Sequence, residues 1–441
     1  MKTTFTALLA LLLLTPAAKA EITVYDHDGY TFGVGGFIEM DTIFDTTRSL
    51  PEVAGNNPVA RKSTFDGENS RMQFSMRNTR LAFSFGAPEV DGWKSRAYLE
   101  TDFLGYDPSV SATQSESAFY TNPALRIRHA YIAVQKDSIQ ILVGQTWTLF
   151  GWQPQYVLSS ISVSPDSGTL YQRTPRIGAT DSFKLNDTNS LDVGLSFVRP
   201  TQRDGTIPNV DFGVLWANDS RKSGFSSANS DMKTKAMSVG LSGTFREFEA
   251  PTSITQRSNN PAWAGAADVL LPILASSDGK DTAGTLTLTG EFTAGRGYGD
   301  EFPGFSGGLA QQFASTQGSN TIGNNVDLDA GLGGYNTQGG FELVKLRTWN
   351  TQLQYFPCAS TFVTVGYGQL FSSNMGDFKG GVNQTASKLY DRSESYFANV
   401  AHDFTKNLRL AFEVAQYSTH YVSDGAMTRD NRAVMAAYYR F

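Results

Sequence analysis

The sequence predicts an all-β protein, a transmembrane antiparallel β-barrel of about 16 strands. Three observations lead to this fold class: an N-terminal export signal, recurring segments in which apolar and polar residues alternate, and a last strand that ends on an aromatic residue, Phe441. Segments of roughly ten residues with period-2 alternation, separated by turn residues, are typical of membrane barrels. A soluble β-sandwich is the alternative class for the same alternation.

The first 20 residues have the form of a secretory signal peptide. Lys2 precedes an apolar run from Ala7 to Leu14, and Ala18-Lys19-Ala20 follows as a small-residue cleavage site. The run is far shorter than the roughly 18 apolar residues of a membrane-spanning helix. We therefore expect cleavage after Ala20, export of the chain, and one barrel domain over residues 21–441.

Charge and cysteine content narrow the possible partners. Removing Lys2 and Lys19 leaves 36 − 2 = 34 basic residues against 42 acidic ones, a net charge of −8. A mildly acidic chain without basic runs argues against a nucleic-acid partner. Cys358 is the only cysteine, so neither an intrachain disulfide nor a thiolate metal site can form. An exported chain without a disulfide needs another feature that stabilises its fold. A continuous hydrogen-bonded barrel wall can be that feature.

The alternating segments follow one another along the chain. Their apolar faces are Phe32, Val34, Ile38, Met40 and Phe44; Trp93, Ala97, Leu99 and Phe103; Leu191, Val193, Leu195 and Phe197; and Met237, Val239, Leu241 and Phe245. From Arg347 onward the predicted strands follow one another closely. In the last one, every second position is Ala433, Met435, Ala437, Tyr439 or Phe441. Short turns, such as Asn186-Asp187-Thr188 and Thr405-Lys406-Asn407, alternate with long Gly/Ser/Asn loops, as barrel topology requires.

Two stretches fit the repeating pattern poorly. The 441 − 20 = 421 mature residues give roughly 26 residues for each of about 16 strands and its loop. Trp263 to Ala275 contains Pro272, which favours an edge strand or a bulge. Arg296 to Gly340 is rich in glycine and has little alternation, so most of it is predicted to be an external loop.

Basic residues cluster on consecutive early strands and are predicted to face the lumen. A barrel of this width holds water, and a charged side chain facing lipid at mid-depth costs about 2–4 kcal/mol. The alternation then turns a set of cations inward on one wall: Arg80, Lys94, Arg96, Arg126 and Arg128. They can attract small anions, because guanidinium groups match carboxylates. They can equally pair with lumenal carboxylates: Glu39, Asp41, Glu100 and Asp102.

Several motifs resemble those of the DcaP-like outer-membrane porins. The most specific are LRIRHAY (Leu125 to Tyr131), LVGQTWTLF (Leu142 to Phe150) and YQRTPRIG (Tyr171 to Gly178). RLAFSF from Arg80 and RAYLETDFLG from Arg96 extend the resemblance, which covers about two-thirds of the mature chain. The resemblance implies a trimeric, 16-stranded porin with an inward-folded third loop at its constriction and a preference for small dicarboxylates and similar anions.

The resemblance also implies positions for the site. The third loop would run from Leu149 to Thr174 and carry Trp152, Tyr156 and Asp166, with Arg173 and Arg176 near the rim of the basic wall. One feature departs from the family pattern. Its members often carry a periplasmic coiled-coil extension, whereas only Glu21 to Tyr30 precede the first predicted strand.

Other sites are weakly supported. The histidines, His27, His129, His402 and His420, lie too far apart to suggest a metal site, and no cofactor is expected. Neither a phosphate-binding loop nor a Gly-x-Ser-x-Gly elbow occurs, so no enzymatic activity is predicted. Asn324 to Asp329 loosely resembles a calcium loop, but a solvated external loop fits it better.

The sequence leads to one main functional hypothesis and two alternatives. The main hypothesis is a passive channel in the outer membrane of a Gram-negative cell, a homotrimer surrounded by lipid, that prefers small anionic solutes. The first alternative is a general diffusion pore without solute preference. The second is a structural or adhesive surface barrel whose long loops bind a partner.

Overall fold

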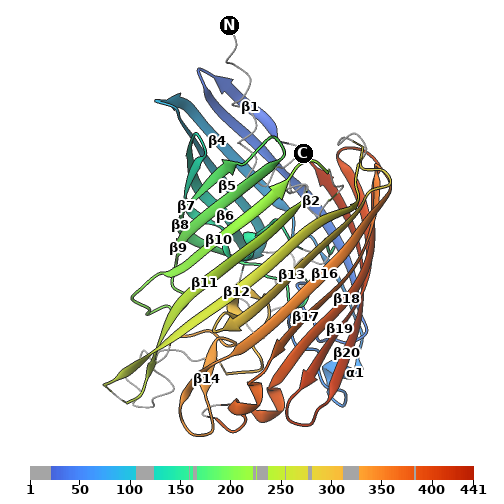
Figure 1. The fold of residues 1–441 in the computed structure, drawn as a ribbon. Coiled ribbons are helices and arrows are strands. Elements are labelled where there is room, and N and C mark those ends of the chain that lie inside the picture. Colours follow the sequence, from blue (N-terminus) through green and yellow to red (C-terminus); the bar gives the residue numbers. More distant parts are fainter. Residues whose placement is uncertain are drawn as a thin grey trace.

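The computed structural model of the chain is a closed antiparallel β-barrel (Figure 1). The structure describes residues 21–105, 124–157, 159–161, 166–221, 225, 237–253, 255–276, 281–310, 327–381 and 384–441. The predicted signal peptide, residues 1–20, lies outside the described residues. The predicted fold class is confirmed.

The wall is formed by long strands that pair with their neighbours in chain order. They are β2 (Tyr30–Asp45), β3 (Arg71–Ser75), β4 (Arg80–Val90), β5 (Trp93–Gly105), β6 (Ala124–Lys136), β7 (Ile139–Trp147), β8 (Arg173–Lys184), β9 (Asn189–Val198), β10 (Asn209–Asn218), β11 (Ser238–Pro251), β12 (Arg257–Leu274), β13 (Leu286–Arg296), β16 (Lys345–Cys358), β17 (Thr361–Ser372), β18 (Tyr390–Asp403), β19 (Leu408–Tyr421) and β20 (Met427–Arg440).

Strand β2 closes the barrel. Its first half pairs with β4 and its second half with β3, so β3 and β4 occupy one position in the wall. On its other edge, β2 pairs with β20 from Phe37↔Arg440 to Asp45↔Arg432. The described residues thus form 16 wall positions, as predicted, and the same sheet contains one additional short strand, β1 (Ile22–His27).

The two ends of the described chain meet at the seam of the barrel. β1 forms a hairpin with the start of β2 and lies on the same edge of β2 as β20. Phe441 continues the β20 pairing, because Gly36 N donates to Phe441 O and Phe441 N donates to Gly36 O, both at 3.1 Å. The last residue is therefore tied into the wall by its backbone.

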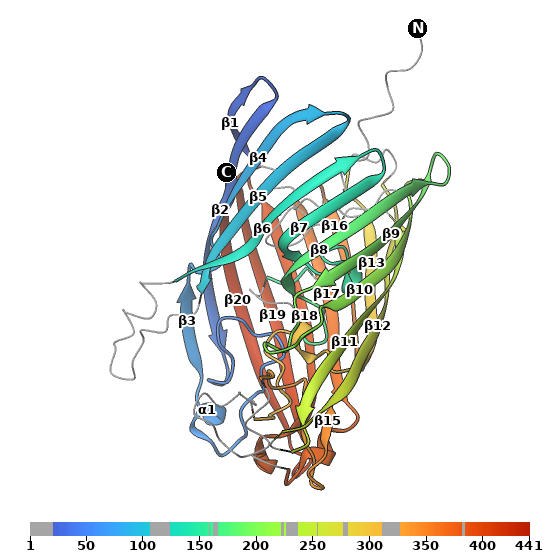
Figure 2. The same ribbon diagram turned by 90° about the vertical axis from the view of Figure 1, so that its left-hand side faces the viewer.

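Connections differ in length between the two ends of the barrel. At one end, called here the turn end, most are short: residues 28–29, 91–92, 137–138, 185–188, 359–360 and 404–407. The described chain begins there, with β1, and ends there, after β20, at the top of Figure 1 and again in Figure 2. The opposite end, called the loop end, carries the connections 46–70, 148–172, 297–344 and 373–389. The predicted turns after Lys184 and Asp403 are confirmed.

Except at β-bulges, side chains alternate between the outside and the inside of the wall. On β2, Ile38 and Phe44 are 47% and 42% exposed, whereas the intervening Glu39 and Asp41 are buried. The same alternation holds on β9, where Leu195 and Phe197 point outward and Ser196 inward. An apolar outside and a polar inside are what a membrane barrel requires and a soluble sandwich does not allow.

Strand β12 is a full member of the wall, although its proline favours an edge or a bulge. The bulge is observed: the register with β13 shifts between Pro272 and Leu274. The pairing with β11 ends at Ser238↔Leu270, before Pro272 is reached. The missing N–H of Pro272 therefore removes no hydrogen bond from the β11–β12 ladder.

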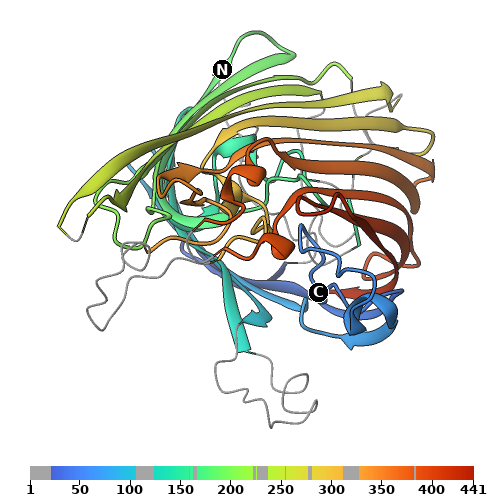
Figure 3. The ribbon, with the colours of Figure 1, turned by 90° about the horizontal axis from the view of Figure 1, so that it is seen from below.

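The connection after β13 is a folded loop at the loop end, as predicted. Its described parts contain the short helix η2 (Gly299–Glu301) and a hairpin of β14 (Gly333–Tyr335) and β15 (Phe341–Leu343). Seen from below, this loop and the β17–β18 connection with η4 (Met375–Phe378) and η5 (Ala386–Lys388) gather across the barrel opening (Figure 3).

Helices are few and short. Apart from 3-10 turns, α1 (Phe65–Glu68) is the helix in the described part of the chain, and Thr64 caps its N-terminus. None of the described helices has the length and apolar character needed to cross a membrane.

Deleting Phe441 is expected to weaken barrel closure. The deletion removes two backbone hydrogen bonds at the seam, each worth about 0.5–1.5 kcal/mol. We expect the barrel to unfold at a lower urea concentration and to show a smaller heat-resistant fraction on SDS gels. Phe441→Tyr, which keeps both backbone bonds, is the control. Equal stability of the deletion and the control would contradict this role.

Candidate functional site

The connection between β7 and β8 folds into the lumen, as the resemblance implies. It opens with η1 (Phe150–Trp152), whose residues are all buried. Glycines on the inner face of the facing wall make room for it: ideal Cβ atoms on Gly213 and Gly240 would lie 2.9 and 3.0 Å from the Trp152 ring. The Trp152 indole N–H lies 3.1 Å from Val214 O and 3.2 Å from Leu241 O.

Tyr156 extends this anchor. Its hydroxyl donates to Ser238 Oγ at 3.0 Å, and its ring lies beside Gly240. Trp152 and Tyr156 are 8% and 1% exposed, packed between the loop and the β10–β11 wall. Both predicted loop residues therefore fix the loop to this wall.

The loop then reaches the opposite wall. Ser159 N donates to Gln352 Oε1 of β16 at 2.7 Å, and Ile161 N donates to Glu413 Oε2 of β19 at 2.8 Å. Asn399 of β18 donates to the Ser159 carbonyl at 2.6 Å. The described residues on both sides of the lumen thus hold one loop between them.

Asp166 lies on the returning half of the loop. Its Oδ1 accepts a hydrogen bond from the Tyr417 hydroxyl of β19 at 2.9 Å. Ser167 N then donates to Ser395 Oγ, and Leu170 N donates to Glu291 Oε1, both at 3.0 Å. Asp166 is fully buried, so it too belongs to the attachment of the loop to the wall.

The predicted basic residues lie on the inner face of neighbouring strands. On β6, Leu125 and Ile127 are 64% and 53% exposed on the outside, which turns Arg126 and Arg128 inward. The positions of Lys94 and Arg96 on β5 and of Arg80 on β4 have the same inward parity.

Two of these arginines are neutralised by carboxylates. Arg126 forms a bidentate ion pair with Asp102, with Nε–Oδ1 and Nη2–Oδ2 distances of 3.0 and 2.6 Å. Arg128 lies 2.6 Å from Glu100 Oε1 and 3.1 Å from Asp102 Oδ2. The pairing that the sequence left open therefore occurs at Glu100 and Asp102. It removes much of the positive field of Arg126 and Arg128.

The other four arginines predicted for the site, Arg80, Arg96, Arg173 and Arg176, have no carboxylate within ion-pair distance among the described residues. Arg80 donates weakly to Asn78 Oδ1 at 3.4 Å, and Arg176 donates to Ser196 Oγ at 2.6 Å. The guanidinium carbon of Arg173 lies 4.6 Å from the centre of the Trp147 ring. That of Arg96 lies 5.3 Å from the centre of the Tyr98 ring. These four side chains therefore keep a positive charge that no ion pair of the described structure offsets.

The aromatic residues at the base of the loop were missed by sequence reasoning. His129 and Trp147 have ring centroids 5.8 Å apart, and Trp147 meets Tyr171 edge-on at 4.7 Å. Arg173 lies over both Trp147 and Tyr171. Flat rings hold a guanidinium without neutralising it. These residues lie within the motifs that resemble DcaP-like porins. The alternation of apolar and polar residues in the sequence does not show that their side chains contact one another.

Two carboxylates on the other wall were also missed. Asp268 of β12 and Glu291 of β13 are direct cross-strand partners on the inner face. Glu291 Oε1 accepts from Leu170 N of the loop and from Asn350 Nδ2, the latter at 2.9 Å. The inward alternation of β12 and β13 could have placed both carboxylates in the lumen. The lumen therefore has acidic groups on the wall that faces the basic one.

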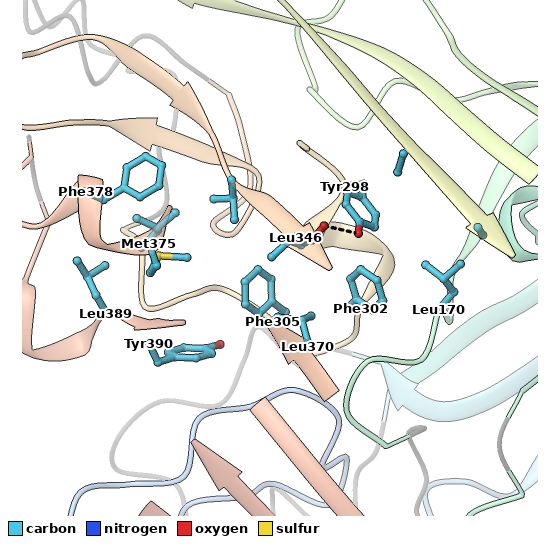
Figure 4. Close-up of a cluster of buried hydrophobic side chains, with 14 of the residues drawn as sticks. Leu170, Tyr298, Phe302, Phe305, Leu346, Leu370, Met375, Phe378, Leu389 and Tyr390 are labelled. Atoms are coloured by element: carbon cyan, nitrogen blue, oxygen red, sulfur yellow. Dashed lines mark hydrogen bonds between the residues drawn. The ribbon is translucent and has the colours of Figure 1, made fainter. Parts of the chain in front are cut away.

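An apolar cluster links the constriction loop to the loop end (Figure 4). Its members include Leu170 of the loop, Tyr298, Phe302 and Phe305 of the β13–β16 connection, and Tyr390 of β18. The Tyr298 hydroxyl donates to Leu346 O at 3.1 Å. The cluster fixes the position of the loops that lie across the opening.

Metal binding finds no support in the described residues. They contain no cluster of three or more histidine, cysteine or acidic side chains that could hold an ion. Residues 324–326 of the loose calcium motif lie outside the described residues. Asp327 and Asp329 form ion pairs with Arg203, the latter at 2.6 Å.

Comparisons with known proteins agree with this architecture. The outer-membrane channel DcaP of Acinetobacter baumannii superimposes with a TM-score of 0.64 at 17% identity, covering 95% of this chain and 100% of that one. An anion-selective porin from Comamonas acidovorans matches with a TM-score of 0.51 at 8% identity, covering 93% of this chain and 100% of that one.

A Salmonella typhi OmpF structure in complex with daunomycin also matches, with a TM-score of 0.51 at 12% identity over 95% of this chain and 100% of that one. No family model matches the chain, and no curated protein matches it in sequence. The resemblance to DcaP-like porins is thus confirmed at the level of the fold.

Replacing Trp152 by alanine is expected to loosen the constriction loop. Removing a buried tryptophan from a packed site costs about 3–5 kcal/mol, here together with the indole hydrogen-bond contacts. We expect a lower melting temperature and a larger, noisier single-channel conductance. Trp349→Ala, at an outward-facing position that is 52% exposed, is the control. If both variants conduct like the parent protein, Trp152 does not hold the loop.

Proposed function

We propose that this chain is an outer-membrane porin that forms a water-filled channel for passive entry of small hydrophilic solutes, with a preference for small anions such as dicarboxylates. The observation that carries the proposal is the wall of Arg80, Arg96, Arg173 and Arg176, four lumenal arginines without a carboxylate partner in the described structure. A 16-position barrel with an apolar outside and a polar inside supports the membrane assignment.

The orientation follows from the two ends of the barrel. Membrane barrels have short turns on the periplasmic side and longer loops outside. The turn end would then face the periplasm and the loop end the exterior. Export would require the predicted signal peptide, residues 1–20, and cleavage before Glu21. A homotrimer is the assembly that the porin resemblance implies, and no enzymatic step is proposed.

The path of an anion would follow the unpaired arginines. Gly144 of β7 is the cross-strand partner of both Tyr131 of β6 and Arg176 of β8. Tyr131 and Arg176 therefore lie in one cross-strand row of the inner face. Arg96 lies one row nearer the turn end, paired with Ala133. Solutes leaving the constriction near Arg173 would therefore meet Arg176 and then Arg96. Successive weak sites allow an anion both to enter and to leave.

One observation supports the structural or adhesive alternative. The apolar cluster at the loop end fixes long loops across the opening, which a closed surface barrel would also need. A barrel of this second kind would insert into a bilayer without conducting ions. The general diffusion pore would conduct without preferring anions.

Selectivity of the double variant Arg96→Gln/Arg176→Gln tests the proposal. Under a salt gradient in planar bilayers, the parent protein is expected to show an anion-selective reversal potential. The double variant is expected to lose at least half of that potential, because two unpaired cations leave the path.

Arg126→Gln/Asp102→Asn is the matched comparison. This variant removes a cation together with its paired carboxylate and leaves the net charge of the lumen unchanged, so it is expected to change the potential less than the double variant does. A cation-selective parent channel, or an equal effect of the two variants, would contradict the anion path.

A further inference from the structure

A hollow in the inner wall near the turn end lies apart from the constriction. It has a volume of about 220 Å³ and is lined by lumenal side chains of β4 to β7, among them Lys94, Arg96, Tyr131, Gln140 and Leu142. Sites for drug-sized ligands measure roughly 300–1,000 Å³, so this hollow suits a molecule of one ring or a short chain.

The strand register explains why the wall is hollow here. Gly86, Arg96, Ala133 and Leu142 are successive cross-strand partners on β4, β5, β6 and β7. Gly86 has no side chain and Ala133 has only a methyl group. The inner surface of the wall is therefore recessed on both sides of Arg96. A Cβ added to Gly86 would collide with the Thr31 hydroxyl. The sequence thus leaves a depression beside a long cationic side chain.

One buried polar group in the hollow lacks a hydrogen-bond partner in the described structure. The Tyr131 hydroxyl belongs to a residue that is only 5% exposed, and it has no hydrogen-bond partner among the described residues. A buried hydroxyl left without a partner costs about 1–3 kcal/mol. Tyr131 lies one row from Arg96, so its hydroxyl and the guanidinium can serve the same ligand.

The hollow carries net positive charge. Arg96 has no carboxylate within ion-pair distance in the described structure, and its planar group lies over Tyr98. Lys94 lies 3.8 Å from Glu89, but both side chains are about half exposed, and such pairs contribute little. An anion entering from the lumen would gain Arg96 and Lys94 as donors.

Beside the polar residues Thr31, Ser84, Ser95, Gln135 and Gln140, the lining has an apolar part that limits what the anion can look like. Leu142 is buried, and Ala133 lies between it and Arg96 in the row. A compact apolar body can cover these two side chains while one carboxylate binds Arg96 and Tyr131. A second carboxylate placed against the Leu142 side chain would lose part of its hydration.

We propose that this hollow is a second, periplasm-facing subsite that binds monocarboxylates with a compact apolar body, of the size and chemistry of benzoate. It rests on the proposed function only in that the solute reaches the hollow through the channel. Arg96 and Tyr131 bind the carboxylate, Lys94 adds positive charge, and Ala133 and Leu142 contact the ring.

Equilibrium binding to the full chain in detergent micelles tests the site without requiring conduction. Benzoate is titrated and followed by saturation-transfer NMR and calorimetry, with terephthalate as the dianionic probe. Benzoate is expected to bind at least tenfold more tightly than terephthalate. Arg96→Gln is expected to weaken benzoate binding about tenfold and Tyr131→Phe about threefold.

Lys184→Gln is the matched control, because Lys184 is a cation at the end of β8 outside the hollow. It is expected to leave benzoate affinity within twofold. Tyr131→Phe changes a single oxygen, so it tests the site even if Arg96→Gln fails to fold. Unchanged affinity in Tyr131→Phe, or equal binding of benzoate and terephthalate, overturns the subsite.

The same preparations separate this inference from the proposed function. An anion-selective channel whose benzoate affinity is indifferent to Arg96 and Tyr131 overturns the subsite and leaves the porin assignment intact. A barrel that binds benzoate as expected but conducts no ions overturns the porin assignment and leaves the subsite intact.

Discussion

The structure depends on the closed ladder of backbone hydrogen bonds around the wall. Hydrocarbon offers no partner to a peptide group, so a membrane-spanning sheet must join its own edges. The junction lies at β2, which pairs with β4 and β3 on one side and with β20 on the other. Once the wall closes, side chains along each strand face lipid and water in turn. Residues that contact a solute must therefore lie at the inward-facing positions.

The constriction loop shows how the wall positions a lumenal element. Small residues on the inner face, such as Gly213 and Gly240, leave space that the rings of Trp152 and Tyr156 fill. Polar residues on the opposite wall, such as Glu413, then bind the loop backbone. Glycine on a barrel strand thus acts here by admitting another part of the chain.

Much of the fold could be predicted from the sequence, because alternation is local. The inward parity of Arg80, Arg96 and Arg126 follows from their apolar neighbours alone. The ion pairs could not be predicted, since they depend on register. A bulge lets Glu100 face His129 while Asp102 faces Arg126, and this brings Arg128 between the two carboxylates. The contact of Asp166 with Tyr417 likewise joins residues 251 positions apart.

We propose that this closed barrel encloses a conducting, water-filled path despite the loops across its opening. Single-channel recording of the purified parent protein in planar bilayers is the decisive experiment. We expect discrete conductance steps that increase in proportion to the salt concentration, as in a path filled with water. Inserted barrels that give no conductance steps would contradict it.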